Sequence, residues 1–150
     1  MVEKYEKYRE YFAFLDKLGG ILDQLTAISN EKNAAVRRDD LLTVNDCMRR
    51  EQAISLSLRA MDRKREKLLS ELGLKGVRLS GLAQRCPEAV QLEARDAAEK
   101  LRSRYAIYKS ASESARMTLE LNLHEIEKII AAQEGGAVPL RGGAFADIRA

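Results

Sequence analysis

Apolar side chains recur at alternating steps of three and four residues along most of the chain, which is the period of an amphipathic α-helix. Three stretches, at about residues 3–38, 40–72 and 87–133, each carry one continuous apolar seam. The seam of the first stretch consists of Tyr8, Tyr11, Leu15, Leu18, Leu22, Leu25, Ser29, Lys32 and Val36. A second row beside it consists of Phe14, Ile21, Ile28 and Ala35. A seam this wide can contact more than one neighbouring helix, so the pattern favours a bundle over a two-stranded coil.

A short polar turn joins the first two stretches. The cations Arg37 and Arg38 suit the carboxyl end of one helix, and the carboxylates Asp39 and Asp40 suit the amino end of the next. We therefore expect an antiparallel helical hairpin whose second arm ends at Gly73. The seam of the second arm consists of Val44, Cys47, Glu51, Ile54, Leu58, Met61, Arg65, Leu68 and Leu72. At 1.5 Å per residue each arm is about 50 Å long, so the molecule should be elongated.

Glycine and proline residues could interrupt or end the expected helices at a few positions. The pair Gly19-Gly20 could kink or break the first helix, because each glycine costs about 1 kcal/mol relative to alanine. The connector, residues 74–82, mixes glycines with spaced apolar residues, so we expect it to lie against the hairpin. Ser80 is predicted to cap a short helix ending at Gln84, and Pro87 to be the first residue of the last long helix.

The last helix carries small residues early in its seam and bulky ones at its end. This seam consists of Ala94, Ala98, Leu101, Tyr105, Tyr108, Ser112, Ala115, Leu119, Asn122, Ile126 and Ile129. Residues 1–134 are therefore expected to form one helical domain, and the glycine-rich residues 135–150 a flexible C-terminal tail. The predicted fold is all-α: a long antiparallel helical hairpin plus a third long helix, in an elongated coiled-coil-like bundle.

Composition narrows the possible partners and the compartment. The net charge is +3 with both signs interleaved, so no sustained positive field favours nucleic acid. No apolar run approaches the roughly 20 residues that span a bilayer, and the first residues do not form a signal peptide, so we expect a cytoplasmic protein without membrane insertion. Cys47 and Cys86 lie outside any C-x-x-C pair and are expected to be reduced. Cys47 should be buried on its seam and Cys86 accessible, where a helix start could lower its pKa.

Candidate chemistry is sparse. The sequence has no glycine-rich phosphate loop and no nucleophile motif, and His124 is the only histidine. We therefore predict no catalytic residue, no metal site and no cofactor. Lys32, Glu51 and Arg65 are polar residues on apolar seams. They could act in a small helical enzyme such as a chorismate mutase. The favoured interpretation is that they make interhelical ion pairs or extend to the edge of the interface, in a protein that works by binding another protein.

Several segments of the hairpin resemble one known family. They are Asn33–Leu41, Glu51-Gln52, Leu58–Leu69 and Leu72–Leu74. Together with the order and lengths of the helices, they are similar to the FlgN-type flagellar export chaperones. The resemblance implies a cytosolic chaperone that binds the C-terminal helices of the flagellar hook-filament junction proteins and delivers them to the flagellar type III export apparatus. It implies no cofactor.

The expected partner-binding surface lies late in the last helix, where small and then large apolar side chains could receive an amphipathic helix. Its candidate residues are Ala115, Leu119, Leu123, Ile126 and Ile130. Packing against the hairpin is at least as good an interpretation for Leu119 and Ile126, but a weaker one for Leu123 and Ile130, which lie beside the main seam. The alternative function is a structural coiled-coil protein that self-associates through the same surface, and the sequence leaves open whether the chain is a monomer or a homodimer.

Overall fold

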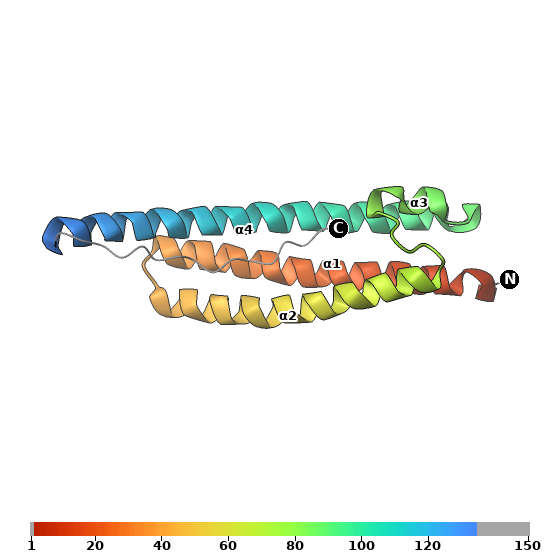
Figure 1. The fold of residues 1–150 in the computed structure, drawn as a ribbon, viewed down its shortest axis with the longest axis horizontal. Coiled ribbons are helices and arrows are strands. Elements are labelled where there is room, and N and C mark those ends of the chain that lie inside the picture. Colours follow the sequence, from red (N-terminus) through yellow and green to blue (C-terminus); the bar gives the residue numbers. More distant parts are fainter. Residues whose placement is uncertain (1, 135–150) are drawn as a thin grey trace.

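Three long helices dominate the computed structural model, which describes the backbone of residues 2–134 and the side chains of residues 5–125 and 127–132 (Figure 1). The predicted tail, residues 135–150, lies outside the described part. The described elements, in chain order, are α1 (Val2–Arg37), α2 (Leu41–Glu71), η1 (Leu79–Gly81), α3 (Leu82–Arg85), η2 (Glu88–Val90) and α4 (Gln91–Glu134). No strand occurs among these residues, and the predicted all-α fold is confirmed.

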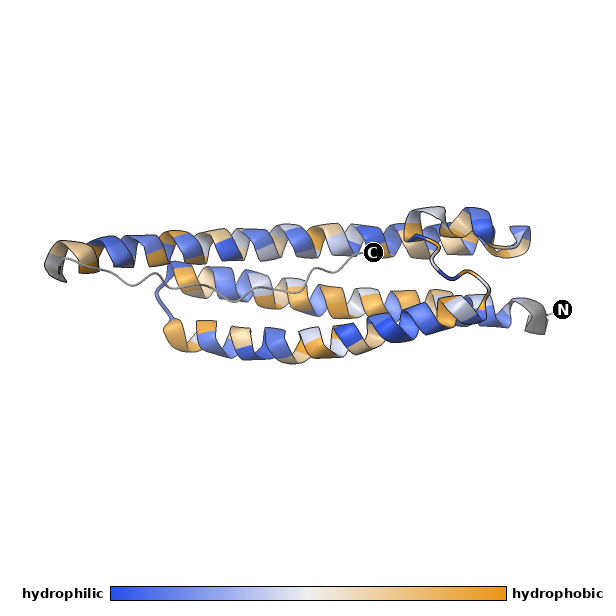
Figure 2. Ribbon diagram, viewed as in Figure 1, coloured by the Kyte–Doolittle hydropathy of each residue, from blue (hydrophilic) through white to orange (hydrophobic). Residues whose placement is uncertain are grey.

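The central helix of the bundle is α1, which packs against α2 on one side and α4 on the other (Figure 1). The chain runs antiparallel from α1 to α2, and α4 then runs parallel to α1 along the length of the molecule. Both predicted rows of α1 supply buried side chains, among them Leu15 and Leu22 from one and Phe14 and Ile28 from the other. Hydrophobic and hydrophilic residues alternate along all three helices, as an amphipathic bundle requires (Figure 2).

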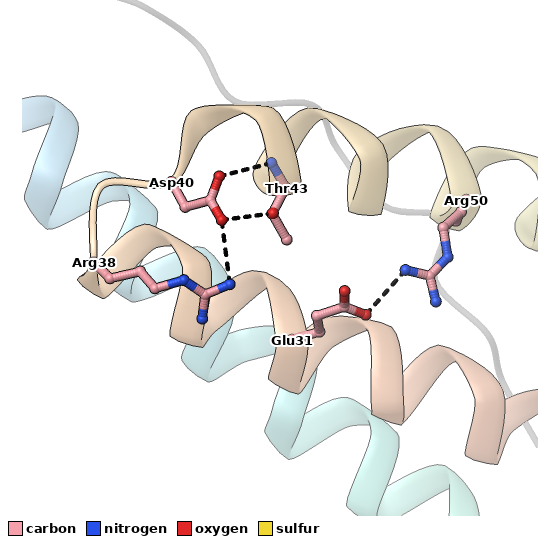
Figure 3. A network of polar contacts seen from close by, with 5 residues as sticks. All are labelled: Glu31, Arg38, Asp40, Thr43 and Arg50. Atoms are coloured by element: carbon pink, nitrogen blue, oxygen red, sulfur yellow. Dashed lines mark hydrogen bonds and ion pairs between the residues drawn. The ribbon is translucent and has the colours of Figure 1, made fainter.

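The hairpin turn is held by the charged residues that the sequence places there (Figure 3). Asp40 is the N-cap of α2, and its carboxylate accepts hydrogen bonds from Thr43 N at 3.1 Å and Thr43 Oγ1 at 2.6 Å. These bonds, with Arg38 at 3.3 Å, lower the pKa of Asp40 below its usual value. Arg50 of α2 reaches back to Glu31 of α1 at 2.9 Å. The predicted chain reversal is therefore confirmed, with N-cap chemistry as its local cause.

The glycine pair does not break α1, which is continuous from end to end. Arg104 of α4 crosses α1 at this point: its Nη1 donates to the main-chain oxygen of Asp16 at 3.1 Å, and its Nε lies 3.4 Å from Asp23. A Cβ built on Gly19 would collide with the Arg104 side chain, whereas a Cβ on Gly20 would meet nothing within 4 Å. The absence of a side chain at Gly19 therefore leaves room for the Arg104 side chain to cross α1.

The connector lies against the bundle, as predicted, and contributes to its core. Its buried side chains are Leu74, Leu79 and Leu82, and Cys86 and Val90 are buried in the segment that follows it. Two local predictions here are wrong. Ser80 lies inside η1, and the N-cap of α3 is Gly81, which makes no side-chain capping bond. Pro87 has extended backbone angles (φ −55°, ψ 145°) and precedes η2, so that α4 begins only at Gln91.

The core consists of two apolar clusters separated by a polar layer. The larger cluster extends in α1 from Tyr11 to Leu25. The smaller one lies at the hairpin turn and consists of Ala35, Val36 and Val44, with Met48 and Leu119 packed against them. Between the clusters three polar side chains are buried: Ser29, Lys32 and Glu51.

The polar layer is built on an interhelical ion pair. Lys32 Nζ lies 3.0 Å from Glu51 Oε1 and 3.0 Å from Oε2, and both side chains are 3% exposed. The third polar seam residue, Arg65, pairs with Asp62 at 2.8 Å and hydrogen-bonds the buried Tyr11. The interhelical ion-pair interpretation is thus confirmed for Lys32 and Glu51, whereas the ion pair of Arg65 lies within α2.

Candidate partner-binding site

The helix α4 is longer than the hairpin on which it packs. Asn122 Nδ2 donates a hydrogen bond to Val36 O at 3.2 Å, one residue before α1 ends at Arg37. From there α4 continues in the same direction to Glu134, past the hairpin turn (Figure 1). Residues 123–134, about 18 Å of helix, therefore project beyond α1. We call residues 123–134 the α4 overhang.

Before the overhang, the seam of α4 is occupied by the bundle. Ala115 is fully buried at 0% exposure, and Leu119 is partly buried against the cluster formed by Ala35, Val36 and Val44. In this arrangement Ala115 offers no surface to a partner, because the hairpin already covers it. The structure thus supports the packing interpretation for Leu119 and assigns the same role to Ala115.

Within the overhang, apolar residues continue along the seam and beside it, and two of them are exposed to solvent. Leu123 is partly buried, whereas Ile129 is 58% and Ile130 38% exposed. Ile126 lies on this seam by its spacing, and its side chain lies outside the described residues. We call Leu123, Ile126, Ile129 and Ile130 the overhang seam. Apolar side chains at this spacing form one face of a helix, and past Arg37 that face lacks the α1 neighbour that covers it earlier.

Sequence reasoning assigned Ile129 only to intramolecular packing. The seam keeps its spacing through the whole helix, so periodicity alone does not show where the neighbouring helix ends. The end of the neighbouring helix is set by the tertiary contact between Asn122 and Val36, because α4 continues for about three turns after Asn122 while α1 ends within one residue of Val36.

The flanks of the overhang seam are mainly acidic. Glu125 is exposed, Glu127 is partly buried, and Lys128 is the one basic residue in residues 123–134. His124 is exposed, and no group of three or more histidine, cysteine or acidic side chains in the described part is arranged to hold a metal ion. The arrangement suits an apolar contact with an amphipathic helix whose flanks carry some basic residues.

The two cysteines do not add a reactive site. Cys47 is fully buried, as predicted, but Cys86 is 5% exposed, so the prediction that it is accessible is wrong. Cys86 packs in the large core cluster together with Leu82 and Val90, because the connector folds onto the bundle. Burial raises the pKa of both thiols, and α4 begins too far along the chain at Gln91 to lower that of Cys86.

Comparison with known proteins decides the family. The family model "FlgN protein" matches residues 7–142, which include nearly all of the bundle and the overhang. The chain belongs to the FlgN family. FlgN proteins are chaperones of flagellar assembly and export, which confirms the resemblance seen in the hairpin. Neither the curated proteins nor the solved structures gave a match.

Membership in the FlgN family gives the bundle a role as a scaffold for protein binding. None of the described helices combines the length and the apolar character needed to cross a membrane. For a FlgN chaperone, the exposed side chains at the end of α4 are a candidate docking surface.

Proposed function

We propose that this chain is a cytosolic type III export chaperone that binds the C-terminal helices of flagellar hook-filament junction proteins through its α4 overhang. The observation that carries the proposal is the apolar seam of α4, which continues past the end of α1 with Ile129 and Ile130 in solvent. The FlgN family supports a flagellar protein as the partner.

The geometry suggests how such a partner binds. An amphipathic helix laid along residues 123–134 takes the place that α1 occupies earlier on α4, so that three-helix packing continues beyond the hairpin. Complete burial of an isoleucine side chain contributes about 1.5–3 kcal/mol, and a partner helix could bury two or three such residues here. While bound, the terminal helix of the cargo is covered and cannot assemble; delivery to the export apparatus then requires only its release.

The test compares two charged variants of the overhang seam with one at the solvent face. Ile130→Asp and Leu123→Asp place an unpaired carboxylate where the apolar face of the partner should lie, and the loss of a desolvated contact of this kind costs several kcal/mol. We expect at least a tenfold weaker Kd for a peptide that copies the C-terminal helix of a junction protein, measured by isothermal titration calorimetry. Circular dichroism should show unchanged helicity, above all for Ile130→Asp, because Ile130 is exposed in the free chain.

Arg116→Asp is the matched control. Arg116 is exposed, pairs only loosely with Glu120 at 3.8 Å, and its replacement changes the charge by two units instead of one. Binding of the peptide should therefore survive in this variant. If Ile130→Asp and Leu123→Asp bind the peptide as tightly as the unmodified chain, the overhang is not the cargo site.

Self-association through the same seam is the competing use of the overhang. Light scattering after size-exclusion chromatography distinguishes the two. A monomer that binds the peptide supports the chaperone, whereas a dimer that Ile130→Asp converts to a monomer, without any affinity for the peptide, supports the structural protein.

A further inference from the structure

A concave surface lies at the opposite end of the bundle from the overhang. The last turns of α2, the connector and one side chain of α4 enclose a cleft of about 780 Å³. Its apolar wall consists of Leu69, Val77, Leu79 and Tyr105. Lys75 and Arg78 of the connector also line it. This volume lies in the range of cavities that hold small ligands or a few side chains of a peptide.

The connector wall of this cleft is fixed by its backbone. Leu74 N donates to Leu69 O at 3.0 Å and Val77 N donates to Leu74 O at 3.0 Å, which closes two successive turns. Gly73 and Gly76 adopt φ angles of +76° and +79°, a region that side chains disfavour, so both turns depend on glycine. Leu74 is buried beneath them and anchors the connector to the core. The cleft is therefore a preformed feature of the fold.

The charges around the cleft favour an anionic ligand. Lys75 and Arg78 are exposed, and within the described residues neither makes a salt bridge. Arg65 also lines the cleft, but Asp62 and Tyr11 already engage its guanidinium. Glu66 is the single carboxylate in the lining. The cleft therefore combines two cations outside any salt bridge among the described residues, Lys75 and Arg78, with apolar side chains.

We propose that this cleft binds a short acidic segment of a second partner protein, one that carries an aliphatic or aromatic residue between its carboxylates. The apolar side chain would contact Val77, Leu79 and Tyr105, and the flanking carboxylates would pair with Lys75 and with the forked guanidinium of Arg78. A peptide fits better than nucleic acid, because two free cations next to Glu66 are too few to follow a phosphate backbone.

This site is independent of the cargo site proposed above. Tyr105 and Asn122 are 17 residues apart on α4, which places the cleft about 25 Å from the start of the overhang. The chaperone could therefore hold a cargo helix at one end while a second protein binds at the other. The inference goes beyond the proposed function, and a failure of either leaves the other standing.

The test uses a fluorescein-labelled hexapeptide of sequence Asp-Glu-Leu-Phe-Asp-Glu, with its amide analogue Asn-Gln-Leu-Phe-Asn-Gln as the uncharged probe. Fluorescence anisotropy should show saturable binding of the acidic peptide to the full chain and at least tenfold weaker binding of the analogue. The double variant Lys75→Glu/Arg78→Glu should lose at least tenfold in affinity for the acidic peptide, with an unchanged circular dichroism spectrum. The overhang variant Ile130→Asp should bind it like the unmodified chain.

Lys17→Glu/Arg49→Glu is the control for net charge. Both residues are exposed, form no salt bridge among the described residues and do not line the cleft. The affinity of this variant for the acidic peptide should therefore fall less than twofold. Equal losses in the two double variants, or no saturable binding by the unmodified chain, would overturn the proposal. So would a labelled single-stranded oligonucleotide that displaces the acidic peptide and loses affinity with Lys75→Glu/Arg78→Glu, since the cleft would then be a nucleic-acid site.

Discussion

The buried pair of Lys32 and Glu51 joins α1 to α2 between the two apolar clusters of the core. Both residues interrupt apolar seams at helical spacing, so each had to lie at a helix interface. The structure adds that they face one another with 3% exposure. A buried ion pair rarely stabilises a fold more than apolar residues of the same size would, but it can fix the register of two helices. Here it aligns α1 with α2.

Lys32→Met should destabilise the protein in a way that depends on pH. Burial raises the pKa of Glu51, and the Lys32 ammonium opposes that rise. Without the ammonium, ionised Glu51 is a lone buried charge, which costs about 3–5 kcal/mol near neutral pH. Below the carboxyl's ordinary pKa of about 4.3 it is protonated in folded and unfolded chains alike, and little of this cost remains. As the pH rises from there, the unfolded chain releases its proton first, so stability falls until the raised folded pKa is passed.

Urea unfolding at several pH values measures this deficit relative to the unmodified protein. The double variant Lys32→Met/Glu51→Gln removes the titrating group and should show a smaller deficit that does not grow over the same range. A deficit of Lys32→Met that is the same at low and neutral pH would mean that Glu51 is not the cause.

The thiols provide a second residue-scale prediction. Cys47 is fully buried and Cys86 nearly so, and burial raises the pKa of each, so neither should react readily as a thiolate. Ellman's reagent should modify both slowly in the native protein and rapidly in denaturant. Fast native labelling of Cys86 would show that the connector opens. The sequence predicted Cys47 because it lies on a helical seam, whereas the burial of Cys86 depends on how the connector folds back, which local spacing does not encode.

At the scale of elements, the sequence predicted each long helix but not the features set by neighbours. The extent of α1 follows from its periodicity, and the turn follows from Asp40 as N-cap. The start of α4 does not, because Pro87 is equally compatible with a first helical position and with the extended residue before η2. The continuity of α1 through Gly19 and Gly20 likewise depends on packing, since Leu15, Leu18 and Leu22 are buried on both sides of the pair.

The glycine pair gives a matched prediction within one helix. Gly20→Ala should stabilise the protein by up to about 1 kcal/mol, because the added methyl group meets open space and alanine is the better helix former. Gly19→Ala should gain clearly less, since its methyl group displaces the Arg104 side chain from Asp16 and Asp23. Thermal unfolding measures both. In an Arg104→Ala background, Gly19→Ala and Gly20→Ala should raise the stability equally. A difference that persists there would mean that Arg104 is not its cause.

At the scale of the whole molecule, helix order and elongation could be predicted, whereas the distribution of free surfaces could not. An elongated three-helix bundle follows from seam lengths and a wide seam on α1. The overhang arises because α4 extends further than α1, and the cleft arises because the connector makes two turns before it returns to the core. These are tertiary facts, and Ile129 and Lys75 acquire their possible roles only through them.

The polar layer that separates the two core clusters has a consequence for local unfolding. Ser29, Lys32 and Glu51 are buried between the two clusters, and the apolar side chains Ile28, Cys47 and Ala115 that are also buried belong to neither cluster, so apolar packing between the hairpin turn and the large cluster is reduced. Such a segment can open as a cooperative unit of lower free energy than the whole domain. Native-state hydrogen exchange should therefore release amides near Val36 and Val44 before those near Leu18.

Exchange of all three regions at one common free energy would contradict this two-part behaviour. If the unit opens separately, the end of the chaperone that carries the overhang can rearrange around partner helices of different shape while the large cluster keeps the chain folded. The ability to bind more than one cargo would then depend on local unfolding of the hairpin-turn segment as much as on the chemistry of the docking surface.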